Sequence, residues 1–430
     1  MANDGNRQSH MPLRGPANAG LVGKLAWRNL WRNRLRTSIM LACMVFGLMG
    51  VVSMMGFMTG MYANMIDNAI SWQTSHIQIS QRAYVDEADI DHQVINPEPI
   101  VDALKQLPSL HAYSKRVVID GMVASARASR GVKIVGVNPQ HEADISPVER
   151  HIIDGAWLDD SARKPMVIST KTAKRLNARV GSKLIITFTN ANKDVTGAAF
   201  RVAGTFQSPS SDFDDGHVYV RDSDLQQAAG ISGFHQIAVL LTIEDNIDST
   251  AVAQVKSQLQ AVSATDNVIR DWQQIQPMLA TLMGQMATSN AVVLIIFVSA
   301  MGFGIVNIML MAVFERTREF GVLMAIGMVK KQIFALIVLE STLLGIVGAL
   351  LGIVISSVVI AILQVTGIPL GSMSQGLAAF GVDTTLYPQV SLSTYQWVFM
   401  TVVLVSALAA VYPAWQILTQ RPVQAMAEKH

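Results

Sequence analysis

The sequence predicts a membrane α-helical bundle that carries a large α+β domain between its first and second membrane helices. Four apolar stretches are each long enough to cross a bilayer, which takes about 20 residues, and a long polar stretch separates the first from the other three. Only 15% of the residues are charged and 50% are hydrophobic, whereas a soluble domain carries about 25% charged residues. The predicted membrane helices are residues 38–63, 288–314, 332–363 and 396–418.

The positions of the basic residues predict how the helical bundle is oriented across the membrane. They are dense before the first apolar stretch and recur after the second, at Arg316, Arg318, Lys330 and Lys331, but residues 364–395 contain no Lys or Arg. Because Lys and Arg collect in cytoplasmic loops, we expect both termini in the cytoplasm. The large domain and the loop at residues 364–395 are then periplasmic. The net charge of +2 predicts no polyanionic partner, so nucleic acid is not expected.

The two ends of the chain are predicted to lie outside the bundle. Residues 1–20 are polar and rich in Gly, Pro and Asn, which is typical of a disordered tail, and residues 419–430 form a cytoplasmic tail. Residues 21–37 mix Lys and Arg with apolar residues that include Trp27 and Trp31. This mixture predicts an amphipathic helix along the membrane surface; a plain basic run beside the membrane is the alternative.

The polar stretch, residues 64–287, is predicted to be the α+β domain with a stalk at each end. Alternating apolar residues predict strands, and apolar residues at steps of three and four predict helices. The predicted strands are residues 76–80, 132–137, 183–189, 200–206 and 237–242, and the predicted helices are residues 101–106, 172–177, 222–229 and 252–262.

No catalytic residue and no metal ligand are predicted. Asp212, Asp214 and Asp215 lack the ligand spacing and the closing Glu of an EF-hand, and they are interpreted as an acidic surface turn. The sequence contains no Gly-x-x-x-x-Gly-Lys-Ser/Thr phosphate loop. We therefore expect that this chain is not an enzyme and binds no cofactor itself.

Small residues recur at four-residue steps in two membrane helices. Gly56 and Gly60 form one pair, and Gly348 and Gly352 form another, which Gly345 extends by about one turn. This spacing lets helix backbones approach closely in lipid, so these glycines are predicted helix-packing positions.

Four methionines form one helical stripe at the outer end of the first membrane helix: Met54, Met58, Met61 and Met65. Methionine is flexible and polarisable, and it suits surfaces that accept varied apolar shapes. The stripe is a candidate contact surface for an acyl chain or an apolar peptide. Ordinary packing is the simpler alternative.

Glu340 lies inside the third membrane helix. A carboxylate in a bilayer is unfavourable unless it is paired or hydrated, which makes Glu340 a functional candidate. A structural hydrogen bond within the bundle is the alternative. The candidate partners are Asn307, on the second membrane helix, and a residue of a second subunit.

The connection at residues 315–329 starts with charged residues and continues with an apolar face that ends at a glycine. This pattern predicts a short helix at the cytoplasmic surface, with a solvated turn as the alternative. Its candidate functional residues are Glu315, Arg316, Arg318, Glu319, Phe320, Gly321, Leu323, Ile326 and Gly327.

At this connection the chain resembles the FtsX/MacB/LolE-type ABC transporter permeases. ERTREFGVLMAIGM looks like the loop whose short coupling helix docks on an ATPase subunit in that family. LAWRNLWRNRLRTSIM, MIDNAISWQTSHIQI and AVYPAWQILTQRPVQAMAE also look like family segments. The resemblance covers both ends and the order of one helix, a domain and three helices. It implies a two-lobed periplasmic domain with an inserted lobe at about residues 116–232.

The resemblance implies a permease subunit of a mechanotransmission-type ABC transporter, arranged as in LolC/LolE with no fused ATPase domain. A separate cytoplasmic ATPase, in two copies, would bind ATP and Mg. Its motion would drive the periplasmic domain to extract or export a lipoprotein, a lipid-like molecule or a peptide. An FtsX-like signalling scaffold that activates an extracytoplasmic cell-wall hydrolase is the alternative. Aspartate at Phe320 or Leu323 is expected to abolish coupling while leaving the fold intact.

The expected partners are a second permease subunit, identical or different, the membrane lipid and a periplasmic protein. The single cysteine, Cys43, lies in the first apolar stretch and cannot form an intrachain disulfide. Extracellular domains of eukaryotes more often carry disulfides. The lack of disulfides therefore favours a bacterial protein, and the family resemblance implies the bacterial inner membrane as its location.

Overall fold

The computed structural model describes residues 19–158, 163–243, 246, 250–325 and 327–419. Most of the two predicted tails lies outside these ranges. The chain divides into two compact units. We call one the helical unit, which contains the chain up to Gly56, Thr288–Gln364 and the chain from Gln389 onwards. We call the other the sheet unit, which contains Phe57–Ala287 and Val365–Pro388.

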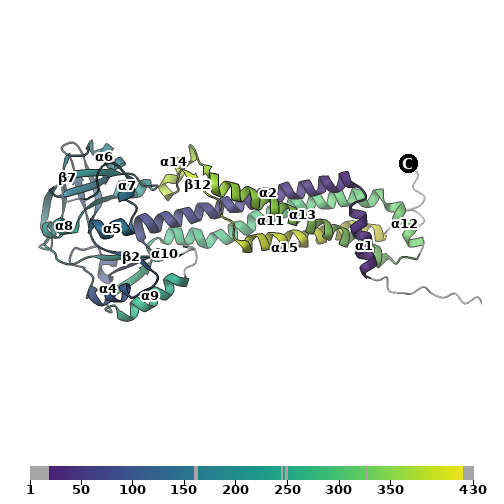
Figure 1. Ribbon diagram of the computed structural model, residues 1–430, viewed down its shortest axis with the longest axis horizontal. Helices are drawn as coiled ribbons and strands as arrows, with labels where there is room; N and C mark the ends of the chain where they lie inside the picture. The colour runs from purple at the N-terminus through teal and green to yellow at the C-terminus, as the bar shows by residue number, and fades with distance from the viewer. Residues whose placement is uncertain (1–18, 159–162, 244–245, 247–249, 326, 420–430) are drawn as a thin grey trace, which may run out of the picture. The chain divides into compact units, whose positions relative to one another are not determined.

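In the part of the chain that the structure describes, four helices are long and apolar enough to cross a membrane. They are α2 (Arg34–Asn68), α11 (Pro277–Glu315), α13 (Lys330–Thr366) and α15 (Leu392–Ala409) (Figure 1). Each contains residues of one predicted apolar segment. Side chains from all four form one apolar core in the helical unit, which includes Leu48, Ile305, Ile337 and Val402.

The amphipathic helix is shorter than the predicted span of residues 21–37. Helix α1 (Ala19–Leu30) ends before a turn, and α2 starts at Arg34, so Arg34 and Arg36 belong to the first membrane helix. Asn33 explains the break, because its side-chain oxygen accepts a hydrogen bond from the backbone N–H of Arg36. Asn is a favoured residue at helix N-termini for this reason.

The fourth membrane segment contains a break that the single helix predicted at residues 396–418 does not have. Helix α15 ends at Ala409, and α16 (Val411–Thr419) follows it. Pro413 accounts for the break, since it lacks the backbone N–H that would donate to the carbonyl of Ala409, four residues earlier.

The sheet unit is built on one ten-stranded sheet with the order β10-β1-β9-β2-β3-β8-β5-β7-β4, in which β6 pairs with β2 and β7. The strands are β1 (Ile77–Gln81), β2 (Leu110–Ala124), β3 (Ser129–Val137), β4 (Ile152–Gly155), β5 (Pro165–Ser169), β6 (Lys183–Thr189), β7 (Val195–Phe206), β8 (His217–Arg221), β9 (Gln236–Leu241) and β10 (Asn267–Asp271). Each strand predicted from the sequence overlaps one of them, so these predictions are confirmed.

Short helices flank the sheet. They are α3 (Arg82–Asp86), α4 (Pro97–Lys105), α5 (Pro139–Ile145), α6 (Thr170–Leu176), α7 (Ser211–Gly216), α8 (Asp222–Ala229), α9 (Thr250–Val262) and α10 (Trp272–Ile275). The four helices predicted for this region overlap α4, α6, α8 and α9. A π-helix, η1 (Ala69–Thr74), continues α2 into the sheet unit.

Residues 364–395 are more than the predicted periplasmic loop. Val365–Pro388 belong to the sheet unit. This segment contains β11 (Ile368–Pro369), α14 (Met373–Leu377), the 3₁₀-helix η3 (Ala378–Phe380) and β12 (Thr385–Leu386), and β11 pairs with β12.

Strand β2 connects the two lobes that the family resemblance implies. Its first half pairs with β9, and its second half pairs with β3 and β6. One apolar core, around Ile79 and Ile237, lies with α4 and α9. A second core, around Ile134, Ile168 and Phe200, lies farther along the sheet. The lobes therefore share one continuous sheet.

The acidic segment forms helix α7 and is not the predicted surface turn. Asp214 is 5% exposed, and its side chain accepts a hydrogen bond from the backbone N–H of Ser208 at 3.0 Å. Asp215 lies 2.6 Å from Lys171 and 2.5 Å from Arg175. Burial raises the pKa of Asp214 to about 6. The carboxylates of Asp214 and Asp215 therefore make structural contacts within the sheet unit.

Three histidines of the sheet unit are held in the neutral form. His76 and His235 each accept a backbone hydrogen bond on Nδ1, from Leu241 and Val118 respectively, at 3.1 Å. A proton on Nδ1 would remove this acceptor. Burial lowers the pKa of both histidines, and it lowers the pKa of His217 to about 4.

The sheet unit should therefore lose stability as the pH falls from about 6.5 towards 4. In this range the unfolded chain binds more protons than the folded chain, so acid favours unfolding, by up to about 3 kcal/mol for His217 alone. Asp214 acts in the opposite direction, because its raised pKa makes the folded state gain relative stability on acidification below about pH 6. The three histidines together should outweigh the single carboxyl group.

Thermal unfolding of the full chain across this pH range measures the effect. The variant His217→Phe keeps a ring against Phe213, whose ring centre lies 4.3 Å from that of His217, but it cannot take up a proton. It should show a smaller loss of melting temperature in acid. An equal loss in the variant and the natural chain would contradict the assignment to His217.

Candidate functional site

Helix α12 (Thr317–Ala325) is the short helix of the connection between α11 and α13. Beyond the helix lies Gly327, whose φ of +105° L side chains rarely adopt. The N–H of Met328 donates to the carbonyl of Leu323 at 3.0 Å, and the N–H of Gly327 donates to that of Met324 at 3.1 Å. These are the two bonds of a Schellman motif. Figure 1 shows α12 at the same end of the helical unit as α1.

Arg316, in the turn between α11 and α12, is the centre of an ion-pair network. Its Nη1 lies 3.1 Å from Oε2 of Glu340 in α13, and its Nε lies 3.1 Å from Oε2 of Glu319 in α12. Glu319 also accepts hydrogen bonds from Nη2 of Arg32, which follows α1, at 2.6 and 2.7 Å. The network therefore joins α1, α12 and α13.

A second ion pair joins two further helices at this end. Nη1 of Arg36, in α2, lies 3.3 Å from Oε2 of Glu315, the last residue of α11. Arg32 and Arg36 belong to the basic stretch predicted at residues 21–37, and nothing in the pattern of a basic run indicates which distant acid each arginine pairs with. Ile326, another candidate coupling residue, lies outside the described residues.

Burial distinguishes the two ends of the network. Arg316 and Glu340 are each 9% exposed, and the Arg316 guanidinium lies 5.4 Å from the centre of the Phe320 ring. A charge buried in this way is strongly unfavourable once its partner is removed. The Glu319 side chain is 47% exposed. Although burial opposes the shift, hydrogen bonds from Arg32 and Arg316 lower the pKa of Glu319.

Glu340 is paired with Arg316 and not with the predicted candidate, Asn307. Asn307 lies exposed on the surface of α11. Arg316 lies in the connection between two membrane helices, so the residues of the membrane helices alone do not indicate it as the partner of Glu340. A long arginine side chain can extend along a helix from its end, and an arginine just outside a membrane helix is therefore the signal that indicates such a partner.

The other candidate coupling residues differ in accessibility. Phe320 is 2% exposed within the apolar core of the helical unit, Gly321 is buried, and Leu323 is half-buried. Arg318 is exposed, and so is Val322, which was not among the candidates predicted from the sequence. The expectation that aspartate at Phe320 leaves the fold intact is wrong, because it would place a carboxylate in the core. Of these residues, Arg318 and Val322 are accessible to a partner protein.

The glycines of α13 bring it close to its neighbours in the helical unit. A Cβ added at Gly348 would lie 2.8 Å from the sulfur of Met44 in α2, and one at Gly352 would lie 2.6 Å from another α2 side chain. A Cβ at Gly345 would lie 2.5 Å from Ser406 in α15. This is the close approach that small residues permit in membrane bundles.

The glycines of α2 make a different contact. A Cβ added at Gly60 would lie 2.3 Å from the carbonyl oxygen of Tyr387, and the carbonyl of Gly56 accepts a hydrogen bond from the backbone N–H of Gln389 at 3.0 Å. Both contacts are with the non-helical segment before α15. Gly60 therefore packs against this segment and not against another helix as predicted, and helix packing at Gly56 stays a prediction.

The predicted methionine stripe lies in more than one environment. Met54 is 39% exposed, Met58 and Met61 are half-buried, and Met65 is 7% exposed. Met61 and Met65 pack in an apolar cluster of the sheet unit that includes Trp272. Packing therefore accounts for Met61 and Met65, and Met54 and Met58 stay candidate contact residues.

The described residues do not bring three His, Cys, Asp or Glu side chains together in a way that could hold a metal ion. The charged groups around Arg316 are paired with one another. This arrangement can hold helices together and pass a displacement between them.

Comparison with known protein families identifies the chain. A model of the MacB-like periplasmic core domain matches residues 37–262, which is more than half of the chain, and a model of the FtsX-like permease C-terminal region matches residues 291–422. The chain belongs to the MacB/FtsX family of ABC transporter permeases. The family resemblance stated from the sequence is thus confirmed, and so is an α+β domain between the first and second of four candidate membrane helices.

Curated relatives include two kinds of exporter. The pyoverdine export ATP-binding/permease protein PvdT of Pseudomonas syringae pv. tomato is 26% identical over 77% of this chain and 50% of its own length. The macrolide export ATP-binding/permease protein MacB of Escherichia coli is 24% identical over 83% of this chain and 54% of its own length. The chain therefore spans about half the length of the curated relatives that it matches.

Solved structures with some similarity include the periplasmic region of MacB from Actinobacillus actinomycetemcomitans. It is 15% identical to this chain, with a TM-score of 0.34, and the match covers 50% of this chain and 97% of that one.

Proposed function

We propose that this permease couples ATP hydrolysis by a cytoplasmic partner ATPase to movement of the sheet unit outside the membrane. The observation that carries the proposal is the ion-pair network around Arg316. It ties α12 to α1 through Glu319 and to α13 through Glu340. A force applied to α12 would therefore be delivered to the membrane helices, because the buried pair resists separation.

The distribution of Lys and Arg supports the proposed orientation of the permease across the membrane. The basic residues beside α1, α2 and α12 favour a cytoplasmic location for both termini and for α12. The sheet unit would then face the periplasm of a bacterium, with the helices in the inner membrane. Arg318 and Val322 would be the residues that meet the ATPase, which would hold ATP and Mg.

An exposed polar side chain on α11 supports pairing with a second permease subunit. Asn307 is exposed within the mostly apolar membrane segment of α11, near Phe303, which is 76% exposed. A polar side chain facing lipid is unfavourable, and polar groups in membrane helices usually face the interior of a bundle. We propose that a second subunit covers this face and that two ATPase copies serve the pair.

The substrate is proposed to be an apolar or amphipathic molecule handled outside the membrane: a lipoprotein, a lipid-like molecule or a peptide. The exposed Met54 and the half-buried Met58 support an apolar contact surface. The relatives named above are exporters, of pyoverdine and of macrolides, which supports transport over the signalling alternative.

The variant Val322→Asp should reduce permease-stimulated ATP hydrolysis by about tenfold or more, since a charge placed in an apolar docking surface costs at least 1.4 kcal/mol. The fold should be unchanged, because Val322 is 47% exposed. ATPase activity of the complex in lipid nanodiscs, with and without the permease, measures the effect.

Val262→Asp is the matched control, because Val262 is 43% exposed at the end of α9 in the sheet unit. It should leave the stimulation intact. Equal stimulation by the Val322→Asp variant and the natural chain would contradict docking at α12. ATP hydrolysis that activates a bound cell-wall hydrolase and moves no substrate would support the signalling alternative in place of transport.

A further inference from the structure

One face of the sheet in the sheet unit is polar where three neighbouring strands meet. Arg270 of β10 lies opposite Gln78 of β1, which lies opposite Ala238 of β9. Two residues along β9, Gln236 lies opposite Arg116 of β2. Directly opposed residues in antiparallel strands project from the same face. Arg270, Gln78, Gln236 and Arg116 therefore share one face, and the intervening isoleucines form a core on the other.

This polar face borders a cavity of about 360 Å³. The π-helix η1 contributes Trp72 and Gln73 to its wall, α3 contributes Tyr84, and the segment after α10 contributes Gln276. The floor contains Arg270 and Arg116. The wall of the cavity thus contains hydrogen-bonding groups and cationic side chains beside apolar ones.

The charge of Arg270 is not neutralised, unlike that of its neighbours. Arg116 is paired with Glu142 at 2.7 Å, and Lys133 is paired with Asp120 at 2.9 Å. Among the described residues, no group accepts a hydrogen bond from the buried Nε of Arg270. Burial lowers the pKa of this guanidinium, yet arginine stays charged in proteins.

An unpaired, partly buried guanidinium is unfavourable for the folded protein alone. Buried charges in proteins are paired or bind a ligand of opposite charge. Arginine presents a planar fork of donors that fits a carboxylate or a phosphate. The geometry of the cavity therefore favours an anionic group beside Arg270.

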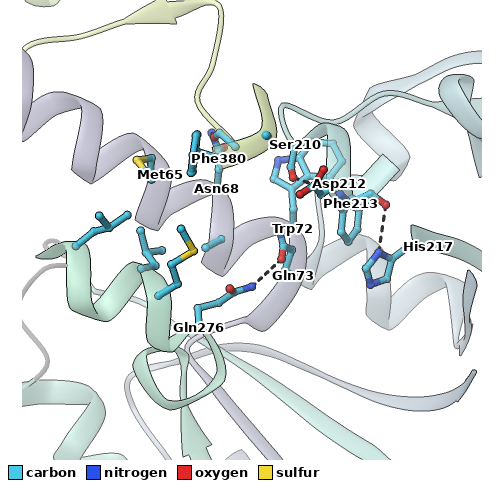
Figure 2. Close-up of a pocket in the computed structure, with 16 residues that line it drawn as sticks. Met65, Asn68, Trp72, Gln73, Ser210, Asp212, Phe213, His217, Gln276 and Phe380 are labelled. Carbon is cyan, nitrogen blue, oxygen red and sulfur yellow. Dashed lines mark hydrogen bonds between the residues drawn. The ribbon is translucent and has the colours of Figure 1, made fainter. Parts of the chain in front are cut away.

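A second cavity, of about 340 Å³, adjoins the first. Trp72, Gln73, Phe213, His217 and Gln276 line both cavities. Figure 2 shows the side chain of Gln276 reaching Gln73, with a hydrogen bond of 2.8 Å between them, and His217 beside Phe213. These side chains lie at the boundary that the two cavities share.

The second cavity is more apolar than the first. Met65 of α2 and Phe380 of η3 line it from two sides (Figure 2), and Leu279 and Leu282 of α11 complete the apolar wall. The carboxylate of Asp212 also lies on this wall, but Asp212 is exposed, so water screens its charge.

We propose that the two cavities form one binding site for an anionic amphiphile, whose carboxylate or phosphate group pairs with Arg270 and whose apolar chain lies among Met65, Leu279 and Phe380. The Gln73–Gln276 amide pair would separate the head from the chain. His217 adds no charge to the wall near neutral pH, because burial lowers its pKa to about 4. The site lies entirely within the sheet unit, and the proposal does not depend on the coupling role of α12.

Photolabelling of the full chain in phosphatidylcholine nanodiscs tests this proposal. The probe is decanoate that carries a diazirine near the end of its chain, and mass spectrometry maps the labelled peptides. We expect saturable labelling of the peptides that contain Met65 and Leu279, with competition by unlabelled decanoate and by decyl phosphate. The matching diazirine alcohol, which has no charge, should label these peptides about tenfold less, since it forms no ion pair with Arg270.

Variants locate the anionic group. Arg270→Gln should reduce labelling by about tenfold, and Arg270→Lys should retain more of it. Arg150→Gln, which changes an exposed arginine of the same unit, should have no effect. Equal labelling by the acid and the alcohol in the natural chain would overturn the proposal without any variant. An absence of saturable labelling by the decanoate probe would also overturn it, because the acyl chain would then not be bound beside Met65 and Leu279.

Discussion

Replacing Arg316 with methionine is expected to destabilise the helical unit by about 3–5 kcal/mol, the usual effect of removing one partner of a buried ion pair. Methionine fills much of the space but leaves the Glu340 carboxylate, which is 9% exposed, without a cation. The same change detaches α12 from α13, since Arg316 is the residue that contacts both Glu319 and Glu340. Thermal unfolding in detergent and coupled ATPase activity measure the two effects separately.

Two further variants separate stability from coupling. Arg36→Met removes a more exposed pair, with Glu315 at 49% side-chain exposure, and should cost at most about 1 kcal/mol. The double variant Arg316→Met with Glu340→Leu should recover most of the stability, because two apolar residues can replace a buried pair. It should not recover coupling. Full coupled activity in the double variant would contradict the role given to this pair.

Replacing Glu142 with glutamine is expected to destabilise the sheet unit by a similar amount, about 3–5 kcal/mol. Glu142 is 0% exposed in α5, and it receives two hydrogen bonds from Arg116 of β2, at 2.7 and 3.0 Å. Glutamine keeps the shape but removes the charge, so the Arg116 guanidinium, 5% exposed, loses its counter-ion. The loss of stability should concentrate in β2, which contributes to the two cores around Ile79 and Ile134.

Hydrogen exchange of the full chain measures this effect strand by strand. Exchange in β2 and β9 should increase far more than in the membrane helices. Asp120→Asn is the control, because it removes the partner of Lys133 from a pair whose side chains are 49% and 56% exposed. That change should cost at most about 1 kcal/mol. Similar exchange profiles for the two variants would show that burial of the Arg116 pair is not what stabilises β2.

The regular elements could be predicted because their periodicity is local. Residues 183–189 alternate in polarity, and β6 has the same bounds and alternates in burial. Residues 222–229 form α8 as predicted, and the helix ends at Gly230, whose φ is +74°. In both segments neighbouring residues alone determine the pattern.

The predictions from the sequence were wrong where contacts between residues far apart in the chain determine the structure. Helix α2 continues beyond the predicted apolar segment because Met65 and Ile66 pack in a cluster with Trp272 of α10. Asp214 is buried because the backbone N–H of Ser208 donates to its side chain. The partner of Glu340 is Arg316, which lies in a connection predicted to be a short helix at the cytoplasmic surface. None of these contacts leaves a periodic signal in the sequence.

The pairing of β1 with β10 limits how the sheet unit can be moved. The chain enters the sheet through Ile77, directly after η1, and leaves it through Asp271, directly before α10, and these two residues are register partners. Pulling α2 and α11 apart would break the hydrogen bonds between β1 and β10 one after another, starting at the pair Ile77 and Asp271. A displacement that both helices make together loads none of these bonds. A displacement of the sheet unit that keeps this ladder intact is therefore one in which the two helices move together.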